Sequence, residues 1–316
     1  MEAVISSELI QGLFYSSIAF MTPVLLVGVA EVMVERSGVL NLCVEGAMLI
    51  GAFSAFMVAY FTGSLGLAIL AAGLSGLLLC LLFSFLVIVL ALDQMVTGLA
   101  INLLTVGLTS YLYRACFGWY VSPVPPHIEN VLQPLKIPIL SDLPIVGDVL
   151  FNHVPLTYFA LLFAILCWWL LFKTKLGLKI RAIGEDPQIA EYLGINVNLI
   201  RFLLLLLEGF IAGIAGSLLS IAFYNMFLDN MTQGRGYIAI ALVILARWNP
   251  LLLLGGAFFF SFIDALQLRI QAIGFTAFPY QFALMMPYLF TIAVLAIAGR
   301  RVKGPASLAK PFKRVR

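Results

Sequence analysis

A run of 47 consecutive residues, from Gly46 to Leu92, contains no Lys, Arg, Asp or Glu. One helical membrane crossing needs about 20 apolar residues, so this run is long enough for two crossings and the turn between them. Hydrophobic residues make up 63% of the whole chain, charged residues make up 10%, and the mean hydropathy is +1.09. The sequence therefore predicts a polytopic membrane protein rather than a soluble domain.

Helices are expected to make the crossings. The strands of a membrane β-barrel would give segments of roughly 10 residues with alternating polarity, whereas this sequence has continuous apolar runs. The runs predict an all-α polytopic membrane protein with about nine transmembrane helices, in a range of about eight to ten that allows for broken or half-helices. They cover residues 9–30, 42–60, 65–90, 95–114, 156–172, 202–222, 237–247, 251–269 and 282–298, and the seventh is short.

Positive charge is concentrated in two segments. Of the 18 Lys and Arg residues, five lie in residues 173–201 and seven in residues 300–316. Basic residues near span ends mark the cytoplasmic side, so we expect a cytoplasmic loop and a cytoplasmic tail on one transmembrane domain, residues 1–316. With the N-terminus outside and nine crossings, the loop and the tail both lie on the cytoplasmic side. The proline-rich residues 115–155 then form the main outer loop, as a simple connection or as a contact for a soluble partner.

The loop of residues 173–201 contains a short helix whose two ends are marked. Asp186 followed by Pro187 is a preferred N-cap with proline at the first helical position, and Gly194 stands where a left-handed residue ends a helix. A helix of two turns is marginal alone, so its apolar stripe (Ile189, Ala190, Leu193) needs a surface to pack on. Its acidic residues favour a protein over anionic lipid as that surface. The contact residues predicted from this pattern are Glu185, Asp186, Pro187, Ile189, Ala190, Tyr192, Leu193 and Gly194.

Polar side chains inside the apolar runs are candidates for a solute pathway. An ionisable group at the bilayer centre costs roughly 2.5–3.5 kcal/mol on insertion scales, so it normally faces protein or water. Glu45 follows a stretch rich in glycine and asparagine, which suits a broken helix beside protein or a cavity, although a structural role is equally open. We expect Glu208 to be a structural hydrogen-bonding residue. Asp264, with Gln267 and Arg269 nearby, either forms an ion pair or lines the pathway. The candidate pathway residues are Asn41, Glu45, Asn102, Thr105, Asn225 and Asp264.

Small residues recur in the sixth run. Gly209 and Gly213 are four residues apart, and Ala212, Gly216 and Ser220 lie on a neighbouring face. This spacing lets helices approach closely in lipid, where hydrophobic burial gives no advantage. The sequence therefore predicts a tightly packed bundle.

Motifs for nucleotide binding, metal binding or catalysis do not stand out. The chain has no GxxxxGK[ST] loop, so it is not expected to bind ATP by that route. The four cysteines are scattered without a CxxC pair, and the two histidines lack ligand spacing. We therefore expect no metal, no bound cofactor, no nucleic-acid partner and no enzymatic activity.

Three ordered motifs resemble a known family. GLKIRAIGEDPQIAEYLGINV is similar to the coupling-helix loop of permease subunits in bacterial ABC importers of the ribose/branched-chain amino acid type. ERSGVLNLCVEGAMLIGA and GRGYIAIALVILARWNP resemble the nucleoside and simple-sugar permeases of that family, and the resemblance covers about residues 25–301. Cys43 stands where the family pattern has glycine, and because cysteine is also small, close packing is still expected.

The resemblance implies a subunit of the bacterial inner membrane with several partners. They are an ABC ATPase subunit that uses the ATP, a second related permease, an extracytoplasmic substrate-binding protein and the surrounding membrane lipid. The short helix would fit a groove in the ATPase, and the turn around Arg247 would be a second inner contact. Nucleosides are the expected solutes, with a simple sugar, riboflavin or a related solute as the alternative.

A transporter of another class also fits parts of the sequence. A stand-alone, ion-coupled secondary transporter would use Glu45, Glu208 and Asp264 as coupling sites. It would need no ATPase, and the capped helix in residues 173–201 would then have no purpose.

Overall fold

The computed structural model describes residues 7–118, 125–136, 146–272 and 303–312, together with a few helical positions between residues 285 and 296. The helices in these ranges are α1 (Ser7–Glu35), α2 (Val44–Thr62), α3 (Leu65–Ser84), α4 (Gln94–Phe117), α5 (Val146–Phe151), α6 (Pro155–Lys173), α7 (Lys175–Glu185), α8 (Pro187–Tyr192), α9 (Val197–Leu218), α10 (Arg235–Leu245) and α11 (Pro250–Ala272). Short π-helical turns extend α3 over Phe85–Val89 and α9 over Leu219–Phe223. Strands β1 (Leu135–Lys136) and β2 (Asn152–His153) form one antiparallel pair.

Seven of the described helices are long and apolar enough to cross a membrane. They are α1, α2, α3, α4, α6, α9 and α11, which confirms the expected polytopic all-α fold. The seventh predicted run is α10, and its 11 residues make it a half-helix. Of the ninth predicted run, residues 282–298, the structure describes only scattered positions (285, 286, 289, 290, 292, 293 and 296), and all of them are helical.

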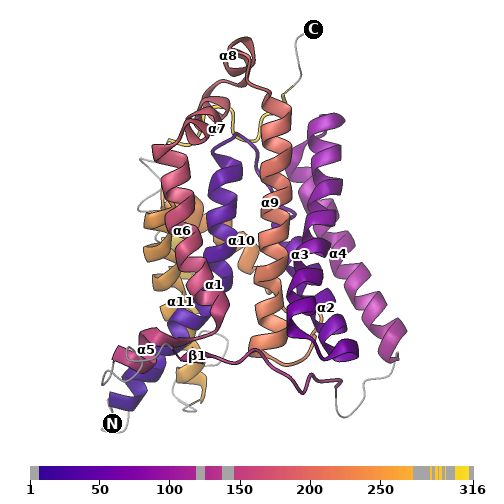
Figure 1. Ribbon diagram of the computed structural model, residues 1–316, viewed down its shortest axis with the longest axis vertical. Coiled ribbons are helices and arrows are strands. Elements are labelled where there is room, and N and C mark those ends of the chain that lie inside the picture. Colours follow the sequence, from indigo (N-terminus) through magenta and orange to yellow (C-terminus); the bar gives the residue numbers. More distant parts are fainter. Residues whose placement is uncertain are drawn as a thin grey trace.

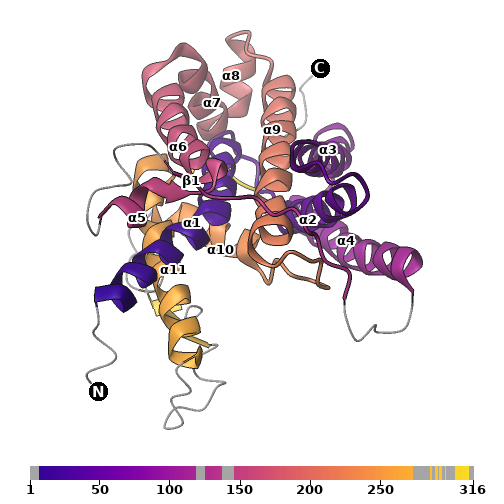
Figure 2. The same cartoon turned by 60° about the horizontal axis from the view of Figure 1, so that its bottom comes forward.

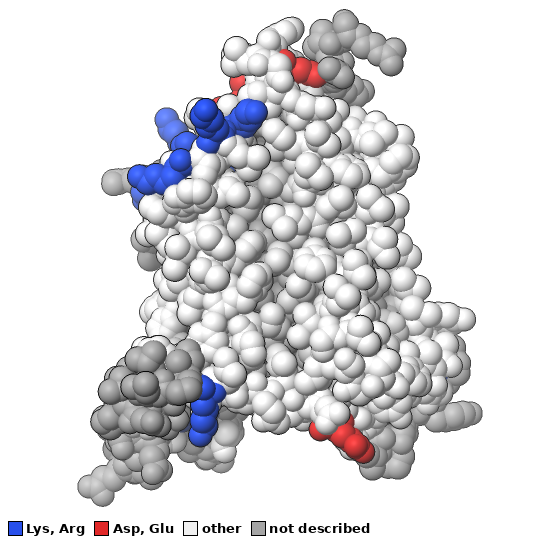
Figure 3. Space-filling view, viewed as in Figure 1, with Lys and Arg blue, Asp and Glu red and all other residues white. Residues whose placement is uncertain are grey.

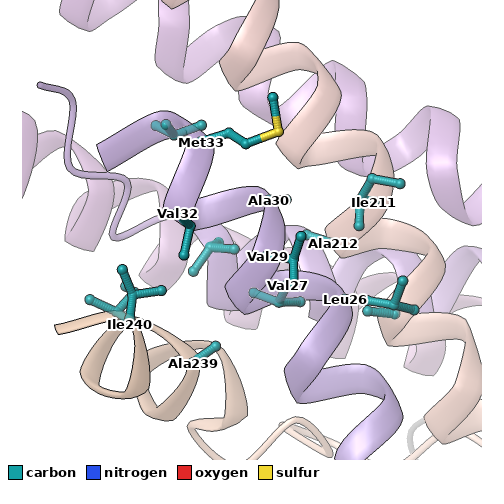
Figure 4. Close-up of a cluster of buried hydrophobic side chains, with 14 of the residues drawn as sticks. Leu26, Val27, Val29, Ala30, Val32, Met33, Ile211, Ala212, Ala239 and Ile240 are labelled. Carbon is teal, nitrogen blue, oxygen red and sulfur yellow. The ribbon is translucent and has the colours of Figure 1, made fainter. Parts of the chain in front are cut away.

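Helix α1 forms the centre of the bundle. Figures 1 and 2 show it between α6 and α11 on one side and α9 with α2, α3 and α4 on the other. Its side chains contact both α9 and α10: Figure 4 shows Val29 near Ala212 of α9, and Ala239 and Ile240 of α10 on another side of the same helix. An apolar residue occupies almost every face of α1, and a helix that is hydrophobic all round is typically buried.

Glycines set the distance between α9 and its neighbours α2 and α3. A Cβ atom added at Gly213 would overlap the carbonyl oxygen of Ala72 in α3, and one added at Gly216 would overlap that of Met48 in α2. Gly51 of α2 meets the backbone of Gly213 in the same way. These contacts confirm the tight packing predicted from the small residues of this span, because any side chain would push the backbones apart.

We expect Gly213→Ala to lower the free energy of unfolding by about 1–3 kcal/mol, because the new methyl group forces helices α3 and α9 apart. Gly107→Ala in α4 is the matched control, since a Cβ atom there would have nothing within 4 Å. That substitution should be neutral or stabilising by up to about 1 kcal/mol, as alanine favours helices. Thermal unfolding of the purified protein in detergent measures both, and equal melting temperatures for the two variants would contradict the packing argument.

The two basic segments meet at one end of the molecule, called here the α8 end. Figure 3 shows Lys and Arg gathered there over α7, with a broad uncharged band below them. The main-chain N–H of Ser307, in the C-terminal segment, donates to the carbonyl of Gly184 at the end of α7 over 2.9 Å. Helix α1 begins at the opposite end (Figure 1). The expectation that both segments share one side of the membrane therefore agrees with the fold.

Candidate functional site

Helix α8 projects from the molecule and has the caps that its sequence predicts. The Asp186 carboxylate accepts hydrogen bonds from the main-chain N–H groups of Gln188 (2.9 Å) and Ile189 (3.0 Å). Gly194 has a φ of +81°, the left-handed conformation expected after the last turn. The sequence reasoning missed α7, which lies before α8 and buries Ile180 and Ile183 against the bundle.

The side chains of α8 divide into one inward and several outward groups. Ala190 is buried, whereas Ile189, Tyr192 and Leu193 are 58%, 79% and 75% exposed. The predicted stripe of residues 189, 190 and 193 is therefore wrong as a single packed face. The three exposed apolar side chains instead form a tip, called here the α8 tip, bordered by the exposed Glu185, Asp186 and Gly194 and the half-buried Pro187. A cluster of exposed apolar groups with a polar rim is typical of a protein-binding surface.

A second candidate site lies inside the bundle, where α2 and α10 begin. Glu45 in the first turn of α2 accepts hydrogen bonds from the main-chain N–H groups of Gly234 (2.7 Å) and Gly236 (2.6 Å). Glu45 therefore caps the N-terminus of α10, where a negative charge is stabilised by unpaired N–H groups and the helix dipole. Gly236 allows this contact, since a Cβ atom there would lie 2.8 Å from the Glu45 Cα atom.

Helix α4 adds uncharged polar groups beside Glu45. The Asn102 amide donates to the Tyr237 hydroxyl over 2.5 Å, and its carbonyl oxygen is buried without a hydrogen-bond partner in the described structure. Gly46 packs α2 on α4, because a Cβ atom there would lie 3.1 Å from the Thr105 hydroxyl oxygen. That hydroxyl donates to the carbonyl of Ile101 over 2.8 Å. We call Glu45, Asn102, Thr105 and Tyr237, with the start of α10, the polar centre.

Asp264 borders the polar centre through an ion pair. Its carboxylate lies 3.7 Å from the guanidinium of Arg235, the first residue of α10. Arg269, which the sequence offered as a neighbour, donates to the carbonyl of Leu9 over 2.7 Å instead. Asp264 therefore forms an ion pair, as one of the two expectations for it has it, and its partner is Arg235 rather than Arg269.

Asn41 and Asn225 do not join the polar centre. The Asn41 amide donates to the Glu208 carboxylate over 2.8 Å, and its main-chain N–H donates to Glu31 over 3.3 Å, all within the core. Glu208 is thus the structural hydrogen-bonding residue that the sequence predicts. Asn225 lies just beyond the end of α9, with a φ of +57°, and its carbonyl accepts a hydrogen bond from Ile128.

The segment of residues 35–45 contacts the segment of residues 234–248 at both ends. Besides the Glu45 cap, the Trp248 indole donates to the Glu35 carboxylate over 2.5 Å. The Arg36 guanidinium donates to the carbonyls of Trp248 and Arg247, each over 3.2 Å. Arg247 itself is exposed. The sequence reasoning missed Glu31 and Glu35, although two glutamates four residues apart in an apolar helix share one face and signal a polar contact there.

Comparison with known proteins places the chain in one family. A family model described as the branched-chain amino acid transport system / permease component matches residues 13–297. The chain is 36% identical over 325 residues to a putative glucose ABC transporter permease, TsgC13, of Haloferax volcanii (96% of this chain, 98% of that protein). It is 33% identical to the guanosine permease NupQ of Bacillus subtilis (94% and 95%) and 33% identical to the nucleoside permease NupC of Lactococcus lactis (91% and 92%). No solved structure matches it. Since the family match spans the polar centre and the α8 tip alike, the chain belongs to the branched-chain amino acid transport system / permease component family.

Proposed function

We propose that this protein is the membrane-spanning permease subunit of an ATP-driven ABC importer and that its solute is a nucleoside. The observation that carries the proposal is the α8 tip, in a chain whose family match covers residues 13–297. A permease that works alone has no use for three exposed apolar side chains on a capped helix outside the membrane. The relatives named as ABC transporter permeases support the same function.

The α8 tip is the docking element for an ATPase subunit. Ile189, Tyr192 and Leu193 enter an apolar groove of that partner, and the exposed carboxylates of Glu185 and Asp186 form the rim. ATP is bound and hydrolysed by the ATPase, and the permease itself uses no cofactor. The Lys and Arg residues of α7 (Lys175, Lys179 and Arg181) keep this end on the cytoplasmic side.

Three further partners complete the importer in the cell membrane. A second, related permease and membrane lipid cover the exposed leucine-rich side of α4, which includes Leu99, Leu103 and Leu104. An extracytoplasmic binding protein delivers the solute at the end opposite α8, where residues 125–136 lie. Nucleic acid has no part in this function.

The polar centre supports a solute rich in hydroxyl groups or ring nitrogens. The buried carbonyl oxygen of Asn102 lacks a partner in the described structure, and such an acceptor favours a solute that donates a hydrogen bond. The Tyr237 ring adds an aromatic face for a nucleobase or a sugar. Two relatives named for nucleoside or guanosine transport favour a nucleoside, and the relative named for glucose makes a simple sugar the second candidate.

Competition for uptake tests the solute. Vesicles or cells with the complete importer should take up labelled adenosine or uridine, and an excess of unlabelled nucleoside should reduce this uptake at least tenfold, whereas ribose, glucose and riboflavin should leave it unchanged. An added solute competes with the labelled nucleoside for the polar centre only if it also fits there. Uptake of labelled glucose by the same importer, with no uptake of labelled adenosine or uridine, would reject the nucleoside proposal in favour of the sugar.

The alternative of a stand-alone secondary transporter is disfavoured by where its acids lie. Glu45 caps α10, Glu208 holds Asn41, and Asp264 pairs with Arg235. Each carboxylate therefore has a protein partner that explains its presence in the membrane. Uptake that persists in cells lacking every ATPase partner would restore this alternative.

A further inference from the structure

Residues 303–312 cross the α8 end of the molecule as a segment called here the strap. Figure 1 shows it in yellow beside α7. Besides its main-chain hydrogen bond to Gly184, the buried Ser307 places its hydroxyl 2.7 Å from the Gly184 carbonyl and 3.2 Å from that of Ile183. The last carbonyls of a helix have no partner within the helix. The strap therefore caps the C-terminal end of α7.

A buried arginine ties the strap to two other segments. Arg201, in the first turns of α9, is only 3% exposed. Its guanidinium donates to the carbonyl of Ser37 over 2.9 Å and to the Ser307 hydroxyl over 3.4 Å, and it lies 5.8 Å from the centre of the Phe312 ring. No carboxylate pairs with it in the described part of the chain, so carbonyl, hydroxyl and ring surround this charge.

The strap also touches the turn between α1 and α2, residues 36–43. Gly38 in this turn has a φ of +87°, and a Cβ atom there would overlap the Ser307 hydroxyl. Gln94 joins the same two segments, because its side chain accepts from the N–H of Leu40 (2.8 Å) and donates to the carbonyl of Lys310 (3.5 Å). Two residues beyond this turn stands Glu45, which caps α10.

The two ends of the strap pack under α8 and against the turn after α10. Phe312 joins the small apolar cluster of Ile183, Ala190 and Val197 beneath α8. At the other end, a Cβ atom on Gly304 would lie 2.8 Å from the Trp248 ring, which also binds Glu35. One continuous set of contacts thus runs from α8 through the strap to the segments that hold the polar centre.

We propose that the strap is a transmission element, which passes a displacement of α7 and α8 to the α1–α2 turn and through it to the polar centre. Ser307 and Arg201 are positioning residues in this path. The proposal rests on the proposed function, because the ATPase supplies the displacement. Closely packed contacts of this kind transmit small shifts rather than absorbing them.

Truncation of the chain in the complete importer tests the strap. A chain that ends at Val302 lacks the strap, and a chain that ends at Phe312 keeps it and is the matched control. We expect the first to retain the ATPase on co-purification and to hydrolyse ATP, but to take up labelled nucleoside at least tenfold more slowly than the control. Ser307→Val should reproduce part of this loss, and Ser307→Thr, which keeps the hydroxyl, should restore uptake.

The outcomes separate the strap from simpler explanations. Normal uptake by the chain ending at Val302 would overturn the proposal. If the truncated chain and Ser307→Val both lost ATPase binding as well as uptake, the proposal would also be overturned. The strap would then only support the fold of α7 and α8. If the unaltered protein itself retained no ATPase, the proposed function would fail rather than the strap.

Discussion

Replacing Leu193 with Asp is expected to abolish both uptake and co-purification of the ATPase, while the protein still inserts into the membrane. Leu193 is 75% exposed at the α8 tip, so the new carboxylate disturbs no internal packing. In a bound complex the same carboxylate would be buried in an apolar groove without a partner, and a buried unpaired charge costs several kcal/mol. A cost of about 4 kcal/mol weakens binding roughly a thousandfold.

The matched control is Leu199→Asp, an exposed leucine in the first turn of α9 at the same end of the molecule. A carboxylate in the first turn of a helix is favourable, so this variant should keep its ATPase and its uptake. Leu193 is a better position for this substitution than Gly194, because the positive φ of Gly194 would add backbone strain to any other residue. Normal uptake and ATPase retention in Leu193→Asp would reject α8 as the docking element.

Replacing Glu45 with Ala is expected to have the second large effect, a loss of stability and of uptake together. Both hydrogen bonds to the start of α10 disappear, and the buried N–H of Gly236 is left without a partner. Hydrogen bonds to a charged group contribute about 1.5–3 kcal/mol each, so a loss of about 3 kcal/mol or more is expected. Uptake should fall at least tenfold, because the half-helix at the polar centre is no longer held.

Thermal unfolding in detergent and uptake of labelled nucleoside measure the two effects of Glu45→Ala. Glu45→Gln should be intermediate, since its amide oxygen accepts one hydrogen bond while its NH₂ group faces the other N–H. Glu129→Ala is the control, because that carboxylate is exposed on residues 125–136. A Glu45→Ala protein as stable and as active as the Glu129→Ala protein would show that the polar centre does not depend on this cap.

Local signals predicted the elements that depend on neighbouring residues. The apolar runs specified the long membrane helices, because each crossing must satisfy its own backbone hydrogen bonds. The ends of α8 were equally predictable from Asp186, Pro187 and Gly194, because helix caps act within a few residues. The glycine spacing of α9 predicted close packing, and the structure adds which neighbours those glycines meet.

Contacts between distant segments were beyond the reach of the sequence. It offered Asn41 and Glu45 alike as pathway residues, although they are only four positions apart. The fold turns the Asn41 side chain to Glu208 in the core and the Glu45 side chain to the start of α10. The two side chains point in different directions because the helix is interrupted between α1 and α2. The course of the chain through this turn depends on packing against α9 and α10.

The amino-acid sequence is enough to predict a helical membrane bundle with an exposed, capped helix between two apolar halves. Periodicity, hydropathy and caps carry that information because they report on free energies that are local to each segment. The packed bundle is needed to see that Glu45 caps α10, that Ala190 faces inward while Leu193 faces out, and that the strap joins α7 to the α1–α2 turn. Each of these contacts depends on segments far apart in the chain, which meet only when the whole bundle has packed.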